Sequence, residues 1–298
     1  MLTGEIRSQI DRIWNTFWAG GIANPLEVIE QITYLLFLKR LDEQETAEGL
    51  KANQTKKPML KRFFPDGKDD KKRSFQEYRW KNFKHLEARD MFTVIDRHVF
   101  PWLRTLGGNG STYSKHMEGA RFTIPTPALL AKVVDMIDKV PMEDRDTKGD
   151  LYEYMLGKIA TAGQNGQFRT PRHIIRLMVE MVEPKPTDVV CDPACGTCGF
   201  LVAVGESLRE RHPEVLLDPK LRRHFHGNLF HGFDFDNTML RIGSMNMLLH
   251  GVENPDVVYR DSLSQDHAGE DEKYTLVMAQ PGRPTTFPCQ ARVEIRRQ

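Results

Sequence analysis

Apolar residues in the first 150 positions recur at the three- and four-residue spacing that is typical of α-helices. The run Asn24-Pro25-Leu26-Glu27 supplies a capping residue, a proline for the first turn and an acidic residue three positions after the cap, so it predicts a helix start. Thr126-Pro127 predicts another helix start, and the glycine-rich run at 107–111 predicts a loop. The apolar face of the first helix comprises Val28, Ile29, Ile32, Leu35, Leu36 and Leu38. No alternating strand pattern interrupts this region, so we expect an α-helical domain over residues 1–145.

The pattern changes after about residue 165, where short apolar runs begin to alternate with helices. Strands are predicted at 189–191, 229–233, 257–259 and 275–279. Helices are predicted at 172–182, from 200 onward and at 236–249, with Gly251 as a left-handed cap. This order is typical of a doubly wound parallel sheet, which normally has more than four strands. The predicted fold class is therefore α + α/β: an N-terminal helical domain followed by an incomplete doubly wound, Rossmann-like domain over residues 146–279.

The last segment, residues 280–298, differs from what precedes it. It holds three prolines and four arginines and shows no apolar period. We interpret it as an aberrant Pro/Arg-rich tail.

Composition narrows the class of protein. The chain has 298 residues, a net charge of +1, 40% hydrophobic and 28% charged residues, which excludes a disordered acidic tail and a membrane protein. The N-terminal residues carry charges where a signal peptide has its apolar core. Four cysteines do not make a disulfide framework. We therefore expect a soluble, reduced, cytoplasmic protein.

Residues 51–90 form a basic segment, with 13 Lys and Arg against 6 Asp and Glu. Interleaved with these charges are Phe63, Phe64, Phe75, Tyr78, Trp80 and Phe83. Such a segment can track phosphates and stack on bases. The alternative is a solvated face whose aromatic residues belong to the core. The segment alone does not establish nucleic-acid binding.

The turn after the first predicted strand is a candidate cofactor site, because glycines let the backbone approach a ligand at the start of a helix. Asp192-Pro193-Ala194-Cys195-Gly196-Thr197-Cys198-Gly199 lies there, without the dinucleotide fingerprint G-x-G-x-x-G. Asp234 closes the second strand 42 residues after Asp192. Two carboxylates suit a ribose and a cationic amino-acid tail better than a pyrophosphate, which favours S-adenosylmethionine over NAD. Cys195 and Cys198 also suggest redox or zinc chemistry, but small side chains packed in a tight turn are the preferred interpretation, and we predict no metal site.

Three motifs resemble those of the DNA methyltransferase subunit of type I restriction–modification systems. They are the runs at 166–172 (GQFRTPR), 192–201 (DPACGTCGFL) and 232–234 (GFD), in that order. The approach Asp146-x-x-Gly149-Asp150-x-Tyr152-Glu153-Tyr154 and the Arg79-Trp80 segment of the helical region are also similar to this family. The resemblance covers roughly residues 1–279. It implies an adenine-N6 DNA methyltransferase that uses S-adenosylmethionine and works with DNA, a specificity subunit and often a restriction subunit.

The resemblance also implies roles for particular residues. The methionine end of the cofactor would be lined by Gln167, Phe168, Arg169, Thr170, Pro171 and Arg172. Asp192 and Gly196 belong to the turn, Thr197, Cys198 and Gly199 would contact the cofactor through their backbone, and Asp234 stands where the family has its acidic ribose ligand. Cys198 departs mildly from the family, in which Gly or Ala is commoner.

The expected catalytic motif is absent. After the strand at 275–279 the family has Asn-Pro-Pro-Phe, whose amide accepts hydrogens from the flipped-out adenine's amine while the aromatic ring stacks on the base. Here the sequence is Gln280-Pro281-Gly282-Arg283, so no catalytic residue is intact and we expect impaired methyl transfer. A truncation or reading-frame change near residue 280 is one explanation. The alternative function is a non-catalytic chain that binds the cofactor or docks the partner subunits, and an NAD-dependent oxidoreductase is disfavoured.

Overall fold

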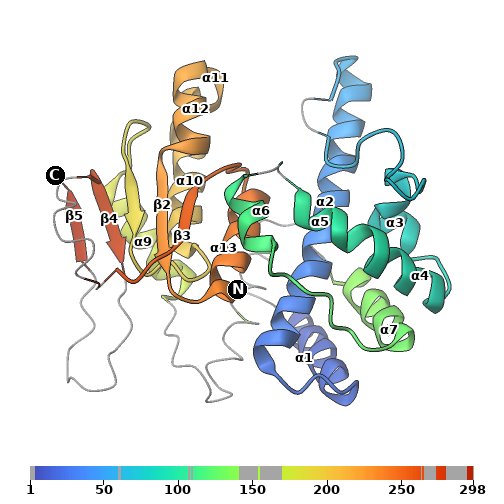
Figure 1. The fold of residues 1–298 in the computed structure, drawn as a ribbon. Coiled ribbons are helices and arrows are strands. Elements are labelled where there is room, and N and C mark those ends of the chain that lie inside the picture. Colours follow the sequence, from blue (N-terminus) through green and yellow to red (C-terminus); the bar gives the residue numbers. More distant parts are fainter. Residues whose placement is uncertain are drawn as a thin grey trace. The chain divides into compact units, whose positions relative to one another are not determined.

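The computed structural model describes residues 4–59, 62–106, 108, 110–140, 154, 170–262, 264, 273–279 and 294–297. The chain divides into two compact units. The first unit consists of Met1–Leu106 and Gly119–Leu156, and the second of Gly107–Glu118 and Gly157–Gln298. Figure 1 shows helices in the first unit and a sheet with helices in the second.

The described part of the first unit is helical, as its apolar spacing predicts. Its helices are α1 (Gly4–Ala19), α2 (Pro25–Thr55), α3 (Trp80–Phe83), α4 (Ala88–Val94), α5 (Phe100–Thr105) and α7 (Pro127–Asp138), with a short 3-10 turn at Phe75–Tyr78 and a π-helical turn at Ile95–Val99. Asn24 Oδ1 accepts a hydrogen bond from the amide of Leu26 at 3.0 Å, and Thr126 Oγ1 accepts one from Leu129 at 3.2 Å. Both predicted helix starts are confirmed.

Helix α2 buries a broad face that includes a lysine. The six apolar residues predicted for this face are all at most 1% exposed. Lys39, 7% exposed, donates from Nζ to the carbonyls of Ile137, Asp138 and Val140 at 3.0, 3.0 and 2.8 Å. A cation suits this position because the carbonyls at the end of α7 carry the negative end of the helix dipole.

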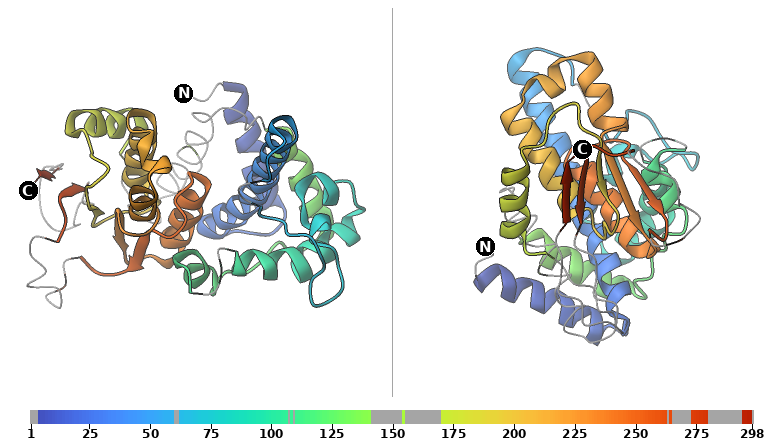
Figure 2. Two further views of the ribbon diagram at one scale, coloured as in Figure 1. Left: turned by 90° about the horizontal axis from the view of Figure 1, so that it is seen from above. Right: turned by 90° about the vertical axis from the view of Figure 1, so that its left-hand side faces the viewer.

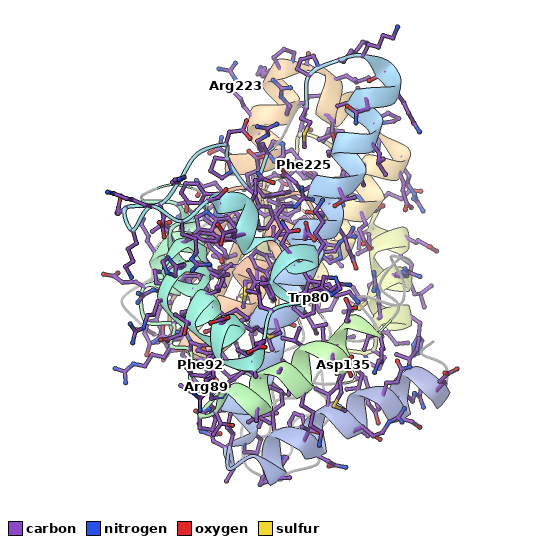
Figure 3. All side chains as sticks on the ribbon, turned by 90° about the vertical axis from the view of Figure 1, so that its right-hand side faces the viewer. Trp80, Arg89, Phe92, Asp135, Arg223 and Phe225 are labelled. Atoms are coloured by element: carbon purple, nitrogen blue, oxygen red, sulfur yellow. The ribbon has the colours of Figure 1, made fainter. Side chains whose placement is uncertain are left out.

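Most aromatic residues of the basic segment at 51–90 are buried in the core of the first unit. Phe64, Tyr78, Trp80 and Phe83 are at most 3% exposed, and Trp80, labelled in Figure 3, donates from Nε1 to Asp138 Oδ1 at 2.8 Å. Arg79 is buried as well and donates from Nε to Asp42 Oδ1 at 2.5 Å. These four rings are not free to stack on bases, so for them the structure favours the core interpretation.

The second unit contains a five-stranded sheet in the order β3-β2-β1-β4-β5. The strands are β1 (Val190–Asp192), β2 (Phe230–Asp234), β3 (Asp256–Tyr259), β4 (Leu276–Ala279) and β5 (Glu294–Arg297). All pairs are parallel except β4–β5, which is antiparallel. The chain steps outward from β1 to β2 and β3 and then returns to the other side of β1, so the strand order reverses at β1. Ligands bind beyond the carboxyl ends of the strands at such a switch point.

The helices of the second unit lie close to the predicted ranges. They are α6 (Thr112–Met117), α9 (Arg172–Val182), α10 (Gly199–Arg211), α11 (Glu214–Leu217), α12 (Pro219–Gly227) and α13 (Asn237–Leu249). Helix α10 packs against both α9 and α13 (Figure 2). Asp236 caps α13 through its side chain, and Gly251 beyond its end has a φ of +79°, as the left-handed cap requires. The predicted α + α/β class is confirmed.

The C-terminal tail and the boundary between the two units differ from what the sequence predicts. The tail contributes β5, although its prolines and arginines pointed away from regular structure. Its signal is the short alternation Val293-Glu294-Ile295-Arg296, which is too brief to stand out beside the composition. Residues 107–118, which the prediction assigned to the helical domain, belong to the second unit, and Tyr154, which it assigned to the Rossmann-like domain, belongs to the first.

Helix α6 is held to the second unit by hydrogen bonds. Thr112 Oγ1 donates to the carbonyl of Pro255 at 2.6 Å, and His116 Nε2 lies 2.7 Å from the carbonyl of Val257 on the edge strand β3. Arg241 of α13 donates from Nε to the carbonyl of His116 at 2.9 Å. The edge of a sheet offers unpaired backbone groups, and α6 satisfies one of them here.

Within the described residues, none of the helices is long and apolar enough to cross a membrane.

Candidate cofactor site

The loops that follow β1, β2 and β3 converge at the carboxyl ends of these strands. The amide of Cys195 donates to the carbonyl of Phe233 at 2.9 Å, and the amide of Gly196 donates to Asp234 Oδ2 at 2.9 Å. Beyond β3, Ser262 Oγ donates to the carbonyl of Pro193 at 2.6 Å. The sequence places these residues up to 69 positions apart, and the parallel order of the strands brings them to one edge.

The turn between β1 and α10 owes its shape to two left-handed residues. Gly196 has a φ of +49° and Cys198 a φ of +62°, and the amide of Cys198 donates to the carbonyl of Cys195 at 2.7 Å. A non-glycine residue pays a small conformational cost in this region. Helix α10 begins directly afterwards, at Gly199, without a side-chain cap from Cys198. The start of a helix is a favourable environment for a negatively charged or polar ligand group.

Two glycines from neighbouring elements make room for the thiols of this turn. A Cβ at Gly232 of β2 would lie 3.0 Å from Cys195 Sγ, and a Cβ at Gly243 of α13 would lie 2.7 Å from Cys198 Sγ. A hydrogen bond to Cys198 and burial raise the pKa of the Cys195 thiol well above its usual value. Both thiols are thus buried in a tightly packed turn, which agrees with the preferred interpretation of the sequence. In the described part of the chain, His, Cys, Asp and Glu side chains form no group of three that could hold a metal ion.

Two carboxylates lie in the convergent loops. Asp192 is 2% exposed, and burial together with the charge of Asp234 raises its pKa to about 7. Asp192 Oδ1 accepts from the amide of Ala194 at 3.1 Å. Burial also raises the pKa of Asp234, whose two oxygens accept from Gly196 and, at 2.8 Å, from the amide of Asp236. A ligand that brings a positive charge or hydroxyl donors would relieve the desolvation of both groups.

Six of the predicted site residues meet at this edge of the sheet. They are Asp192, Gly196, Thr197, Cys198, Gly199 and Asp234. The carbonyl of Thr197 accepts from Asn246 Nδ2 of α13 at 2.9 Å. Their role in binding a cofactor stays a prediction.

The other predicted site residues are only partly described. Gln167, Phe168 and Arg169 lie outside the described residues, as do Gln280 and Pro281 of the expected catalytic position. Thr170 and Pro171 precede α9, and Arg172 is its first residue. The guanidinium of Arg172 lies 3.2 Å from Glu206 Oε2 of α10. Of the approach motif at 146–154 only Tyr154 is described, and its hydroxyl donates to Asp11 at 2.7 Å.

Several residues of the site were missed by sequence reasoning. Phe235, directly after the half-buried Asp234, is 73% exposed, which is unusual for a large apolar side chain. Ser262 ties the loop after β3 to the first turn, and Gly243 and Asn246 support that turn from α13. Phe235 could have been noticed in the sequence, because it is an apolar residue between two aspartates. The other three carry no local signal, since their role depends on the packing of distant elements.

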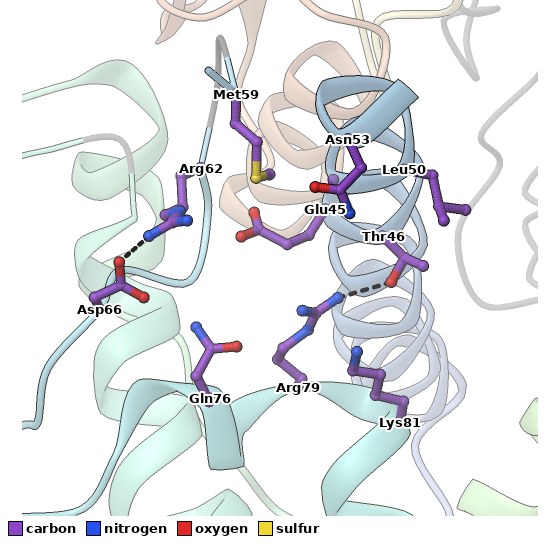
Figure 4. A pocket seen from close by; sticks show the side chains of 11 residues that line it. Glu45, Thr46, Leu50, Asn53, Met59, Arg62, Asp66, Gln76, Arg79 and Lys81 are labelled. Atoms are coloured by element: carbon purple, nitrogen blue, oxygen red, sulfur yellow. Dashed lines mark hydrogen bonds and ion pairs between the residues drawn. The ribbon is translucent and has the colours of Figure 1, made fainter. Parts of the chain in front are cut away.

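The helical unit contains an open pocket of about 300 Å³ between the end of α2 and the basic segment (Figure 4). Four of the charged side chains that line it have hydrogen-bonding partners within the unit. Arg62 pairs with Asp66, Arg79 Nη2 donates to Thr46 Oγ1 at 2.7 Å, and Glu45 Oε2 accepts from the amide of Phe63 at 2.7 Å. Nothing in this pocket resembles the convergent carboxylates of the second unit.

Comparison with known families agrees with the fold and the site. Residues 143–291 match the profile of the N-6 DNA methylases, and residues 6–137 match the HsdM N-terminal domain. The chain therefore belongs to the N-6 DNA methylases. Within that class, it is a member of the type I restriction–modification methyltransferase subunits, and the family resemblance of the sequence is confirmed.

Individual relatives give the extent of the similarity. The chain is 25% identical over 275 residues to the EcoEI methylase subunit of Escherichia coli and 32% identical over 266 residues to the StySJI methylase subunit of Salmonella typhimurium, covering 88% and 85% of this chain. It spans only 52% and 44% of those relatives. A crystal structure of a modification subunit assigned to a type I restriction enzyme from Vibrio vulnificus YJ016 matches with a TM-score of 0.73 and 25% identity, over 94% of this chain and 60% of that one.

Proposed function

We propose that this chain binds S-adenosylmethionine at the convergent loops and is the modification, adenine-N6 methyltransferase, subunit of a type I restriction–modification system. The observation that carries the proposal is the meeting of Asp192 and Asp234 at the switch point of the sheet, across a turn that leads into a helix. Family membership supports the methyl-transfer class, which requires a methyl donor.

The residues present fit this cofactor. Asp234 accepts from backbone amides on both oxygens and still has lone pairs that can accept from the two ribose hydroxyls. Asp192 is a buried acid whose ionisation a cationic ammonium group favours. Phe235 offers an exposed ring on which a purine can stack. Asp192 and Asp234 would hold the polar ends, while Gly196 leaves the approach open because it has no side chain.

The cofactor supplies an electrophilic methyl group when it is bound. Methyl transfer to adenine additionally requires groups that accept the amine's hydrogens and stack on the extruded base. Gln280-Pro281-Gly282-Arg283 follows β4 in the sequence and lacks both the asparagine and the aromatic ring of the family motif. We therefore expect methyl transfer by this chain to be impaired, while cofactor binding is retained.

The proposed partners are DNA, a specificity subunit and a restriction subunit. These partners are inferred from the family, and no surface of this chain is used to identify them. A structure from a study of the assembly of a type I restriction–modification system matches with a TM-score of 0.57 and 26% identity, which supports an assembled role. The second candidate function is a non-catalytic chain that binds the cofactor and docks to the specificity subunit, and the absent catalytic motif favours it.

The experiment combines the chain with its specificity subunit, unmethylated DNA and cofactor carrying a radiolabelled methyl group. We expect the two subunits to co-purify and the labelled cofactor to be retained, with methyl incorporation into DNA at background. Robust incorporation would establish an active enzyme and contradict the impairment. Absence of both co-purification and cofactor retention would contradict the proposed function.

A further inference from the structure

Helices α9, α10 and α13 share a cluster of charged side chains, of which only Arg172 is among the residues that the sequence resemblance assigns to the cofactor. The cluster consists of Arg172, the first residue of α9, Glu206 in the middle of α10 and His250 directly after α13. Their side chains are only 15–16% exposed. Arg172 Nη2 lies 3.4 and 3.2 Å from the two oxygens of Glu206, and His250 Nε2 lies 3.6 Å from Glu206 Oε1.

Arg172 is the main partner of Glu206. His250 Nδ1 faces the carbonyl of Asn246 at 2.8 Å, so that nitrogen carries the proton of the neutral ring. Burial lowers the pKa of His250, which favours this neutral form. In that form Nε2 has no proton to donate to Glu206, whereas the guanidinium is permanently charged. The carboxylate of α10 thus holds the first residue of α9 by a charge-assisted contact.

This contact joins α9 to α10, the helix that begins at the proposed cofactor turn. The first turn of α9 is closed locally by the amides of Ile174 and Ile175, which donate to the carbonyl of Pro171 at 2.9 and 3.0 Å. A Cβ added at Gly199 would lie only 3.3 Å from Ile175 Cδ1. The side chain of Ile175 in α9 therefore packs closely against the start of α10. The segment from Thr170 to Arg172 is therefore pinned to the helix that begins at the cofactor turn.

We propose that Glu206, through Arg172, is a positioning residue that holds the start of α9 against the cofactor turn and thereby sets the affinity for the amino-acid end of S-adenosylmethionine. This inference rests on the proposed function. It assigns Arg172 a different role from the one that the sequence resemblance implies, because its guanidinium pairs with Glu206 instead of serving as a direct cofactor ligand.

The first test uses the full chain and two ligands. We expect Glu206→Gln to weaken binding of S-adenosylmethionine about tenfold, which corresponds to the loss of one charge-assisted contact. Binding of 5′-methylthioadenosine, which has the adenosine but no amino-acid end, should change less than about twofold. The matched control is Glu210→Gln, an exposed position one turn further along α10, which should leave both affinities unchanged. Equal weakening for both ligands would indicate a merely structural role and overturn the proposal.

The second test separates positioning from direct contact by a double-mutant cycle. If Arg172 acts through Glu206, Arg172→Gln and Glu206→Gln should each weaken binding of S-adenosylmethionine, and the double variant should be no weaker than either one. Arg172→Lys should retain affinity within about threefold, because a single nitrogen of Arg172 contacts both carboxylate oxygens. Additive losses would show that Arg172 contacts the cofactor itself and would overturn the proposal.

A readout without cofactor keeps this inference distinct from the proposed function. Hydrogen exchange at the amides of Ile174 and Ile175 should be about tenfold faster in Glu206→Gln than in the wild type or in Glu210→Gln. Unchanged exchange there would overturn the anchoring of α9. Failure of the wild-type chain to bind S-adenosylmethionine would instead overturn the proposed function, and the role in affinity with it.

Discussion

At the scale of single residues, Asp192 is the position where stability and binding are expected to conflict. Burial raises its pKa to about 7, so the folded chain binds a proton that the unfolded chain releases near pH 4. The folded state therefore loses stability as the pH rises from about 4 to about 7, and the loss is complete above that range. A buried carboxylate that costs stability is readily explained if it serves a ligand.

We expect Asp192→Asn to raise the free energy of unfolding by about 1–3 kcal/mol at pH 8 and by clearly less at pH 5, because the amide removes the ionisation that burial opposes. The same variant should weaken binding of S-adenosylmethionine. Denaturant titrations at the two pH values measure the difference. Asp135→Asn, on an exposed face of α7 and labelled in Figure 3, is the control and should change neither stability nor binding. An equal effect of Asp192→Asn at both pH values would contradict the raised pKa.

A second prediction at this scale concerns the space beside Cys198. A Cβ at position 243 would lie 2.7 Å from Cys198 Sγ and 3.0 Å from the carbonyl oxygen of Gly196. Gly243→Ala should therefore destabilise the chain by about 1–3 kcal/mol, although alanine is the better helix former, and should weaken cofactor binding. Gly227→Ala, at the end of α12 with open space around it, is the matched control.

Adding Cys198→Gly to Gly243→Ala should restore part of the lost stability, because the substitution removes the sulfur and suits a φ of +62°. No recovery in thermal unfolding would show that the clash with the thiol is not the cause of the loss.

At the scale of elements, α6 shows how a segment from the middle of the helical region completes the second unit. The bond from Thr112 Oγ1 to the carbonyl of Pro255, at 2.6 Å, fixes the start of α6 just before the edge strand β3. We expect Thr112→Val to lower the free energy of unfolding by about 1 kcal/mol and to speed hydrogen exchange in β3. Thr93→Val, which removes only a local bond to the carbonyl of Arg89 on an exposed face of α4, should have a smaller effect and leave β3 unchanged.

Elements whose signals are local could be predicted from the sequence. Asn24 and Thr126 cap their helices as expected, and the four parallel strands lie within one residue of the predicted starts. The turn from Asp192 to Gly199 and its partner Asp234 were also found in sequence, because their residue types and order are specific. The attachment of α6, the strand β5 and the pairing of Arg172 with Glu206 were not found. Each depends on contacts between segments that no local pattern connects.

At the scale of the whole molecule, the two units differ in how their aromatic and charged side chains are buried and paired. The helical unit buries most of the aromatic residues of its basic segment, and its buried cations Lys39 and Arg79 have partners within the unit. The second unit instead has the buried Asp192 and the half-buried Asp234 near the exposed ring of Phe235 at the switch point of its sheet. This contrast supports a ligand site in the second unit, and membership of the N-6 DNA methylases supports a methyl donor as the ligand.

The central claim is tested most directly by calorimetric titration of the purified chain with S-adenosylmethionine. We expect saturable binding by the wild type, at least about tenfold weaker binding by Asp234→Ala because the ribose loses its acceptors, and unchanged binding by Glu210→Gln. Absence of saturable binding by a wild-type chain that unfolds cooperatively, or wild-type affinity in Asp234→Ala, would contradict the assignment of the convergent loops as the cofactor site.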